Sequence, residues 1–137
     1  MSVYLDCNAT TPLEPRVREE MLRYFDIEYG NAGSRTHDFG NRAKTAVQKA
    51  RDQVAAVVKA EREEIIFTSG ATESNNIALL GLAEYGEKTG KKHIISSQIE
   101  HKAVLEPFQV LQRRGFALTL VPPTEGGWIE PDSIRKA

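Results

Sequence analysis

Three short apolar runs alternate with two segments of helical periodicity, and this alternation restricts the fold more than any other feature. The runs, each short enough for a buried strand, are 65–68, 93–96 and 117–121. The helical segments cover residues 72–88, with Ile77, Leu80 and Ala83 expected inward, and a stretch bearing Val104, Phe108 and Leu111. Strands that alternate with helices favour a parallel sheet covered by helices. The sequence therefore predicts an α/β fold.

Further helices are expected on both sides of this region. Pro15 suits a first helical turn, and apolar residues at helical spacing continue towards Gly30. A longer helix is predicted from Asp38, with small apolar residues on one stripe: Ala43, Ala46, Val47, Ala50, Val54, Val57 and Val58. A last helix begins near Pro131, shortly before Ala137. Because natural domains rarely end in a first helical turn, we expect more chain to follow.

Charge and composition exclude several classes of protein. The 18 basic and 19 acidic residues are interleaved and give a net charge of −1, so no direct binding of nucleic acid is expected. The first apolar run is too short for a signal peptide, and no window resembles a membrane span, so we expect a cytoplasmic protein that does not contact membranes. The single cysteine cannot form an internal disulfide, which agrees with a reducing compartment.

Small residues between the first run and its helix indicate an anion site. The first amides of a helix lack internal partners and carry the positive end of its dipole, so Gly70, Ala71 and Thr72 could bind a phosphate. The hydroxyls of Ser69 and Thr72 could add donors. The alternative is an ordinary connection in which glycine and a capping residue only begin the helix. The patterns that bind nucleoside triphosphates and dinucleotides are absent from the sequence.

His101 lies in the connection that follows the next run. Loops at the carboxyl ends of parallel strands open on the same edge, so the His101 ring could stack on a flat heterocycle whose phosphate is bound near Gly70. The alternative is a surface or capping histidine. No metal site is expected. For Cys7, a buried or half-buried structural thiol is favoured over a nucleophile, because no neighbouring base or cation would lower its pKa.

Together these segments resemble the cysteine desulfurases of the NifS and IscS type, class V aminotransferase-like enzymes of pyridoxal-phosphate fold type I. The residues that carry the resemblance are Tyr4-Leu5-Asp6, Asn8-Ala9-Thr10-Thr11-Pro12, Gly30-Asn31, Ser34-Arg35, His37, Glu64 to Ser74, and Glu100-His101-Lys102-Ala103-Val104. The resemblance covers nearly the whole chain. It implies that residues 1–14 are an N-terminal arm and that 15–137 are the first, incomplete part of the pyridoxal-phosphate-binding large domain.

The resemblance also implies roles for single residues. Ala71 and Thr72, with Gly70, would hold the phosphate of pyridoxal 5'-phosphate, and His101 would be the catalytic residue that stacks on its ring. The arm residues Asn8, Ala9 and Thr10 would border the substrate pocket. The implied reaction converts L-cysteine to L-alanine and passes persulfide sulfur to an acceptor protein, as in iron-sulfur cluster biogenesis, in a homodimer when the enzyme is full length.

The chain departs from this family by what it lacks. No lysine here matches the Schiff-base lysine, and Cys7 does not match the persulfide cysteine, so the isolated chain is expected to be inactive. The family's topology also puts 65–68 and the two later strands toward opposite edges of the sheet, so we expect 65–68 not to pair with 93–96. An alternative is a non-catalytic, truncated module that binds a partner chain, or binds the cofactor without a covalent link.

Overall fold

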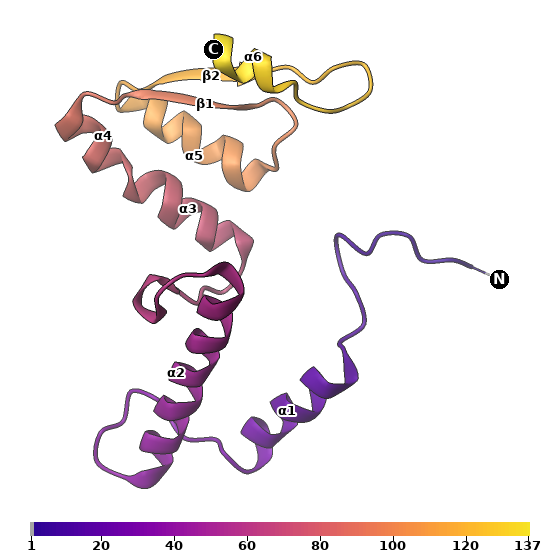
Figure 1. The fold of residues 1–137 in the computed structure, drawn as a ribbon, viewed down its shortest axis with the longest axis vertical. Coiled ribbons are helices and arrows are strands. Elements are labelled where there is room, and N and C mark those ends of the chain that lie inside the picture. Colours follow the sequence, from indigo (N-terminus) through magenta and orange to yellow (C-terminus); the bar gives the residue numbers. More distant parts are fainter. Residues whose placement is uncertain (1) are drawn as a thin grey trace. The chain divides into compact units, whose positions relative to one another are not determined.

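The computed structural model describes residues 2–137 (Figure 1). The chain divides into two compact units, the first ending at Ile66 and the second beginning at Phe67. This division falls inside the predicted large domain of residues 15–137, whose bounds stay a prediction. No helix between residues 2 and 137 is both long and apolar enough to cross a lipid bilayer.

The first unit contains helices joined by long connections. Its elements are α1 (Pro15–Asp26), α2 (Asp38–Val58) and the short 3-10 helix η1 (Arg62–Glu64). The predicted starts at Pro15 and Asp38 are confirmed, and residues 2–14 form neither helix nor strand. Of the apolar stripe expected on α2, Ala43 is buried, but Val57 is 83% exposed. The predicted residues do belong to helix α2, but only some of their side chains are buried in the first unit.

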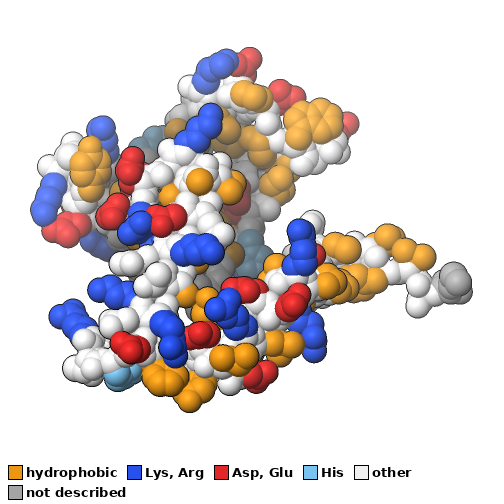
Figure 2. Space-filling model, turned by 60° about the horizontal axis from the view of Figure 1, so that its bottom comes forward, with side chains coloured by type: hydrophobic (Ala, Val, Ile, Leu, Met, Phe, Trp, Pro, Cys, Tyr) orange, Lys and Arg blue, Asp and Glu red, His pale blue; other side chains and the backbone are white. Residues whose placement is uncertain are grey.

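Figure 2 shows apolar side chains exposed along the arm that leads to the first residue. Large apolar side chains that are exposed in the arm and in α1 include Val3, Leu5, Leu13, Val17, Met21 and Phe25. No residue of α1 is buried. Exposed apolar surface of this extent is unusual for a monomeric soluble protein.

Helix α1 begins with a cap from a carboxylate. Glu14 accepts a hydrogen bond from the Val17 amide at 3.0 Å and another from Nε of Arg16 at 3.0 Å. The side chain of Arg16 and then the Val17 amide lower the pKa of Glu14 below its usual 4.5. The ionised form of Glu14 is therefore the one that stabilises the start of α1.

We expect the helix content of α1 to depend on pH through this cap. Because the pKa of Glu14 is lowered in the folded state, its contribution is present above the usual 4.5 and is lost as the pH falls through the lowered pKa. The backbone chemical shifts of residues 15–18 would report the change. Glu14→Ala should remove the cap at neutral pH, whereas Glu20→Gln in the same helix should not. Equal shifts in both variants would contradict the cap.

The second unit contains the sheet. Its elements are α3 (Ala71–Gly81), α4 (Ala83–Thr89), β1 (His93–Ser97), α5 (Lys102–Arg113), β2 (Ala117–Val121) and α6 (Pro131–Lys136). Strands β1 and β2 pair in parallel, with His93 opposite Ala117 and Ser97 opposite Val121. Helix α5 connects them and packs with α3 in a layer beside the pair (Figure 1). The predicted parallel, helix-covered arrangement is confirmed for these two strands.

A small apolar core joins the helices to the sheet. Ala83, Phe108, Leu111 and Phe116 are buried together, and partly buried side chains from α3, β1 and β2 pack around them. The expected inward positions Leu80 and Ala83 are confirmed, but Ile77 is 45% exposed. The face of α3 that carries Ile77 therefore lacks a covering layer in the second unit.

Two predicted elements differ in the structure. Residues 65–68 were expected to form a buried strand, but they form none, and Ile66 is 67% exposed. A strand requires a neighbouring strand, and the sheet of the described residues consists of β1 and β2. The helix expected over 72–88 is interrupted at Leu82, directly after Gly81. Glycine in a helix interior costs about 1 kcal/mol relative to alanine, which favours an interruption there.

Candidate functional site

The turn before α3 presents unpaired backbone donors. Gly70 is the N-cap residue, and its backbone is extended, with φ 161° and ψ −178°. The amides of Ala71 and Thr72 come first in the helix and have no acceptor among the described residues. A Cβ built on Gly70 would meet no atom within 4 Å, so the backbone there is open to a ligand. The turn can therefore accept an anion without rearranging.

Hydrogen bonds on the Gly70 carbonyl hold this turn in place. The Thr68 hydroxyl donates to the Gly70 oxygen at 3.1 Å, and the Ser74 amide donates to the same oxygen at 3.1 Å. The Ser74 hydroxyl lies 3.2 Å from that oxygen and 2.7 Å from the Thr68 hydroxyl. Because the carbonyl is bound on the helix side, the Gly70 peptide has a fixed orientation.

Glu73 holds the residue on the other side of Gly70. One of its carboxylate oxygens accepts from the Ser69 amide at 2.6 Å and from the Ser69 hydroxyl at 2.8 Å. These two hydrogen bonds, the backbone bond first, lower the pKa of Glu73 below its usual 4.5. The Ser69 hydroxyl, predicted as a donor to phosphate, is already engaged. Sequence analysis missed Glu73, because the capping-box pattern pairs residues three apart and this pair is four apart.

Thr72 remains as the unused side-chain donor of the turn. Its hydroxyl makes no hydrogen bond with any residue of the described chain, whereas its carbonyl accepts from the side-chain amide of Asn76 at 2.8 Å. The residue is exposed in the first turn of α3. Thr72 therefore adds a free hydroxyl to the two free amides.

His101 is the N-cap residue of α5. Its ring nitrogen Nδ1 accepts from the Ala103 amide at 3.1 Å, so the proton of the neutral ring lies on Nε2. The loop before it is held by the buried Ser97, whose hydroxyl donates to Glu100 at 2.7 Å, and by the Gln98 amide, which donates to the Val121 carbonyl at 3.0 Å. The capping alternative is thus observed, and it leaves the ring exposed.

The starts of α3 and α5 lie at the same end of the second unit. The two helices pack side by side, and both begin at the end of the unit where β1 finishes (Figure 1). Gly70, the N-cap residue of α3, and His101, the N-cap residue of α5, therefore both lie at this end of the unit. Both connections were expected at the carboxyl ends of parallel strands, but only the one at His101 follows a strand here. That the His101 ring and the turn at Gly70 share one ligand stays a prediction.

The sequence of this chain matches a known protein family. The family model described as aminotransferase class-V matches residues 3–137. The chain belongs to the class-V aminotransferase family. The predicted family membership is thus confirmed, and so is the fold class, because the two solved structures described below share it over nearly the whole chain.

Individual relatives of this class-V aminotransferase chain are cysteine desulfurases. The chain is 48% identical to cysteine desulfurase IscS of Pseudomonas syringae pv. tomato over 139 aligned residues. This alignment covers 100% of the chain and 34% of that protein. A solved NifS-like protein is 43% identical with a TM-score of 0.89, over 99% of this chain and 37% of its own. The solved structure of DndA from Streptomyces lividans is 54% identical to the chain, with a TM-score of 0.83. The match covers 98% of this chain and 37% of the DndA chain. The chain spans about a third of the length of these relatives.

The arm residues of the class-V aminotransferase chain lie in the first unit. Asn8, Ala9 and Thr10 form an exposed turn in which the Ala9 and Thr10 amides donate to the Asp6 carbonyl at 3.1 and 3.3 Å. The Tyr4 hydroxyl closes this turn at 2.6 Å from the Thr10 hydroxyl. Their place beside the substrate stays a prediction. Cys7 is exposed, so the expected buried or half-buried thiol is wrong.

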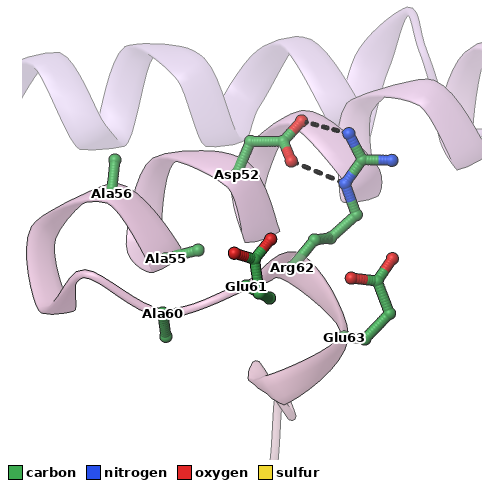
Figure 3. A pocket seen from close by; sticks show the side chains of 7 residues that line it. All are labelled: Asp52, Ala55, Ala56, Ala60, Glu61, Arg62 and Glu63. Atoms are coloured by element: carbon green, nitrogen blue, oxygen red, sulfur yellow. Dashed lines mark hydrogen bonds and ion pairs between the residues drawn. The ribbon is translucent and has the colours of Figure 1, made fainter.

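The first unit also has a shallow pocket of about 390 Å³, which Figure 3 shows. It is lined by Asp52, Ala55, Ala56, Ala60, Glu61, Arg62 and Glu63. The guanidinium of Arg62 binds both oxygens of Asp52, at 2.5 and 2.8 Å, and this pairing raises the pKa of Arg62. Arg62 is the one basic residue among those that line the pocket, and it is thus already paired with Asp52. Between residues 2 and 137, no three metal-binding side chains gather into a metal site.

Proposed function

We propose that this chain is the phosphate-binding part of a pyridoxal-phosphate-dependent cysteine desulfurase. The observation that carries the proposal is the set of free donors at the start of α3, which begins at the same end of the second unit as α5, the helix that His101 caps. The sequence similarity to proteins named cysteine desulfurase supports L-cysteine as the substrate. The chain spans about a third of such proteins, so the complete activity requires further polypeptide.

The residues present fit the phosphate of the cofactor. The amides of Ala71 and Thr72 and the Thr72 hydroxyl are three donors without partners among the described residues. The start of α3 adds the favourable end of its dipole, about 0.3 to 1 kcal/mol for a surface anion. The open space at Gly70 lets a bulky anion approach the backbone. These features would orient the cofactor by its phosphate.

His101 would cover the ring of the cofactor. Its Nδ1 is used in capping α5, so the ring cannot turn freely, and its flat face stays available for stacking. Bound pyridoxal phosphate supplies an electron sink for an amino acid substrate. The residues of this chain would hold the cofactor in place, and the covalent attachment and the sulfur-carrying cysteine would come from the remainder of the enzyme.

The wider context of the enzyme follows from the same family. We propose a homodimer when the polypeptide is full length, and a sulfur-acceptor protein as partner; the exposed apolar side chains of the arm and α1 support further contacts. The free, exposed Cys7 is compatible with the reducing conditions of the cytoplasm, where we place the protein.

Thr72→Ala tests the phosphate site directly. We expect the variant to bind pyridoxal phosphate about tenfold more weakly, because a hydrogen bond to a charged group is lost. Isothermal titration calorimetry of the 137-residue chain would measure this. Pyridoxal without phosphate should bind equally to both proteins. Thr89→Ala is the matched control, since Thr89 donates to the Tyr85 carbonyl within α4.

The result tests the phosphate site. A chain that shows no preference for pyridoxal phosphate over pyridoxal, with Thr72→Ala unchanged, would contradict that site. A non-catalytic module that binds the cofactor without a covalent link would also lose affinity in Thr72→Ala, so desulfurase activity on co-expression with the remainder of such an enzyme is the measurement that separates it from the proposal. A selective loss in Thr72→Ala, with Thr89→Ala unaffected, would support the cofactor site.

A further inference from the structure

The polar side chains around the start of α3 fall into two groups. Those that bind within the turn are Thr68, Ser69, Glu73 and Ser74. Thr72 alone has a hydroxyl without a partner in the described part of the chain. The first group therefore determines the shape of the turn, and the second is available to a ligand.

Glu73 has a special position in the first group. It is the one charged member, and it reaches back over four residues to hold both polar groups of Ser69. Ser69 directly precedes Gly70, the extended N-cap residue of α3. Fixing Ser69 on one side, while Thr68 and Ser74 fix the Gly70 carbonyl on the other, leaves the Gly70 peptide little freedom.

We propose that Glu73 is a positioning residue for the cofactor phosphate, which it orients by holding the Ser69 amide and hydroxyl. This inference rests on the proposed function. It assigns Glu73 no contact with the cofactor. Its carboxylate keeps Ser69 out of the donor set and leaves the amides of Ala71 and Thr72, with the Thr72 hydroxyl, to receive the anion.

The charge of Glu73 opposes this role, which makes the inference testable. A carboxylate in the first turn repels a phosphate bound at the same helix end, so charge alone would weaken binding. Glu73 can help only through its hydrogen bonds. A glutamine at this position keeps an oxygen that accepts from the Ser69 amide and removes the charge, whereas an alanine removes both.

Both Glu73→Gln and Glu73→Ala are neutral at this position, so a difference between them reports only the hydrogen bonds to Ser69. We expect Glu73→Gln to bind pyridoxal phosphate as tightly as the unchanged chain or more tightly. Glu73→Ala should bind roughly five- to tenfold more weakly than Glu73→Gln, because the turn must be ordered on binding. Glu84→Ala, which removes an exposed carboxylate of α4 paired with Lys88, is the control for net charge.

A second measurement does not depend on the cofactor. Hydrogen exchange of the Ser69 amide, followed by NMR on the free chain, should be faster in Glu73→Ala by about tenfold and nearly unchanged in Glu73→Gln. Faster exchange in the alanine variant together with weaker phosphate binding would support the proposal. This readout also shows that the variants are folded, since the amides of β1 and β2 should keep their protection.

The outcomes separate the two inferences. Equal affinity of Glu73→Ala and Glu73→Gln, while Thr72→Ala still loses binding, would overturn the role of Glu73 and leave the phosphate site intact. An unchanged affinity in Thr72→Ala would overturn both, because no phosphate would then be bound at this turn.

Discussion

Leu111→Ala is expected to unfold the second unit. Leu111 is 1% exposed and belongs to a core of only four buried residues, with Ala83, Phe108 and Phe116. Truncating a buried leucine costs about 2 to 5 kcal/mol of unfolding free energy. A single core in a chain segment this short rarely supplies more than about 3 to 5 kcal/mol. The loss therefore equals most of the stability that the unit can have.

Urea denaturation followed by circular dichroism measures this effect. The unchanged chain should show a transition for the second unit, and Leu111→Ala should lose it. Val110→Ala is the matched control, because Val110 precedes Leu111 in α5 but is 37% exposed. We expect the control to shift the unfolding free energy by less than about 1 kcal/mol. A Leu111→Ala variant as stable as the control would show that this core does not hold the unit together.

Residues 65–68 are expected to form a strand when the further polypeptide proposed above is present. In the isolated chain they form no strand, and Ile66 is largely exposed. Co-expression with the complementary part of a class-V aminotransferase should supply a neighbouring strand. Because exchange of a paired, buried amide requires opening of the structure, we expect protection of these amides to rise by about a thousandfold or more.

Hydrogen exchange with mass spectrometry would follow peptides that cover this segment. Residues 124–128, an exposed turn of the second unit, are a suitable internal reference. The Thr124 amide is bound to the Trp128 carbonyl at 2.9 Å and should exchange at the same rate in both samples. If protection of 65–68 stays low in the assembled protein, the segment is a loop in the native enzyme, and its assignment as a sheet strand is wrong.

The features that could be predicted from the sequence are those set by neighbouring residues, and those that could not depend on residues far along the chain. Helix starts at Pro15 and Asp38 and the strand Ala117–Val121 were predictable, because caps and apolar spacing are local signals. Residues 65–68 carry an equally clear strand pattern, but a strand also needs a neighbouring strand, and the sheet of the described residues is made of β1 and β2 alone. The exposure of Ile77 and Val57 has the same origin, since periodicity identifies an apolar face and not what covers it.

The candidate site shows the same limit at the scale of single side chains. The open amides near Gly70 could be predicted, because a glycine stands directly before an expected helix. The capping role of His101 could be predicted as an alternative, because this histidine also stands directly before an expected helix. The choice between Ser69 and Thr72 as donors could not be made from sequence, because both are small hydroxyl residues. Only the orientation of Glu73 toward Ser69 decides between them.

The parallel pairing of β1 with β2 has a practical consequence. Each strand is hydrogen-bonded along one side, so each has an outer row of backbone groups without a strand partner among the described residues. Such rows recruit other extended segments, and a second copy of the chain is the nearest source at high concentration. Self-association should therefore rise with concentration when the chain is purified alone, so binding measurements are best made on dilute, freshly prepared samples.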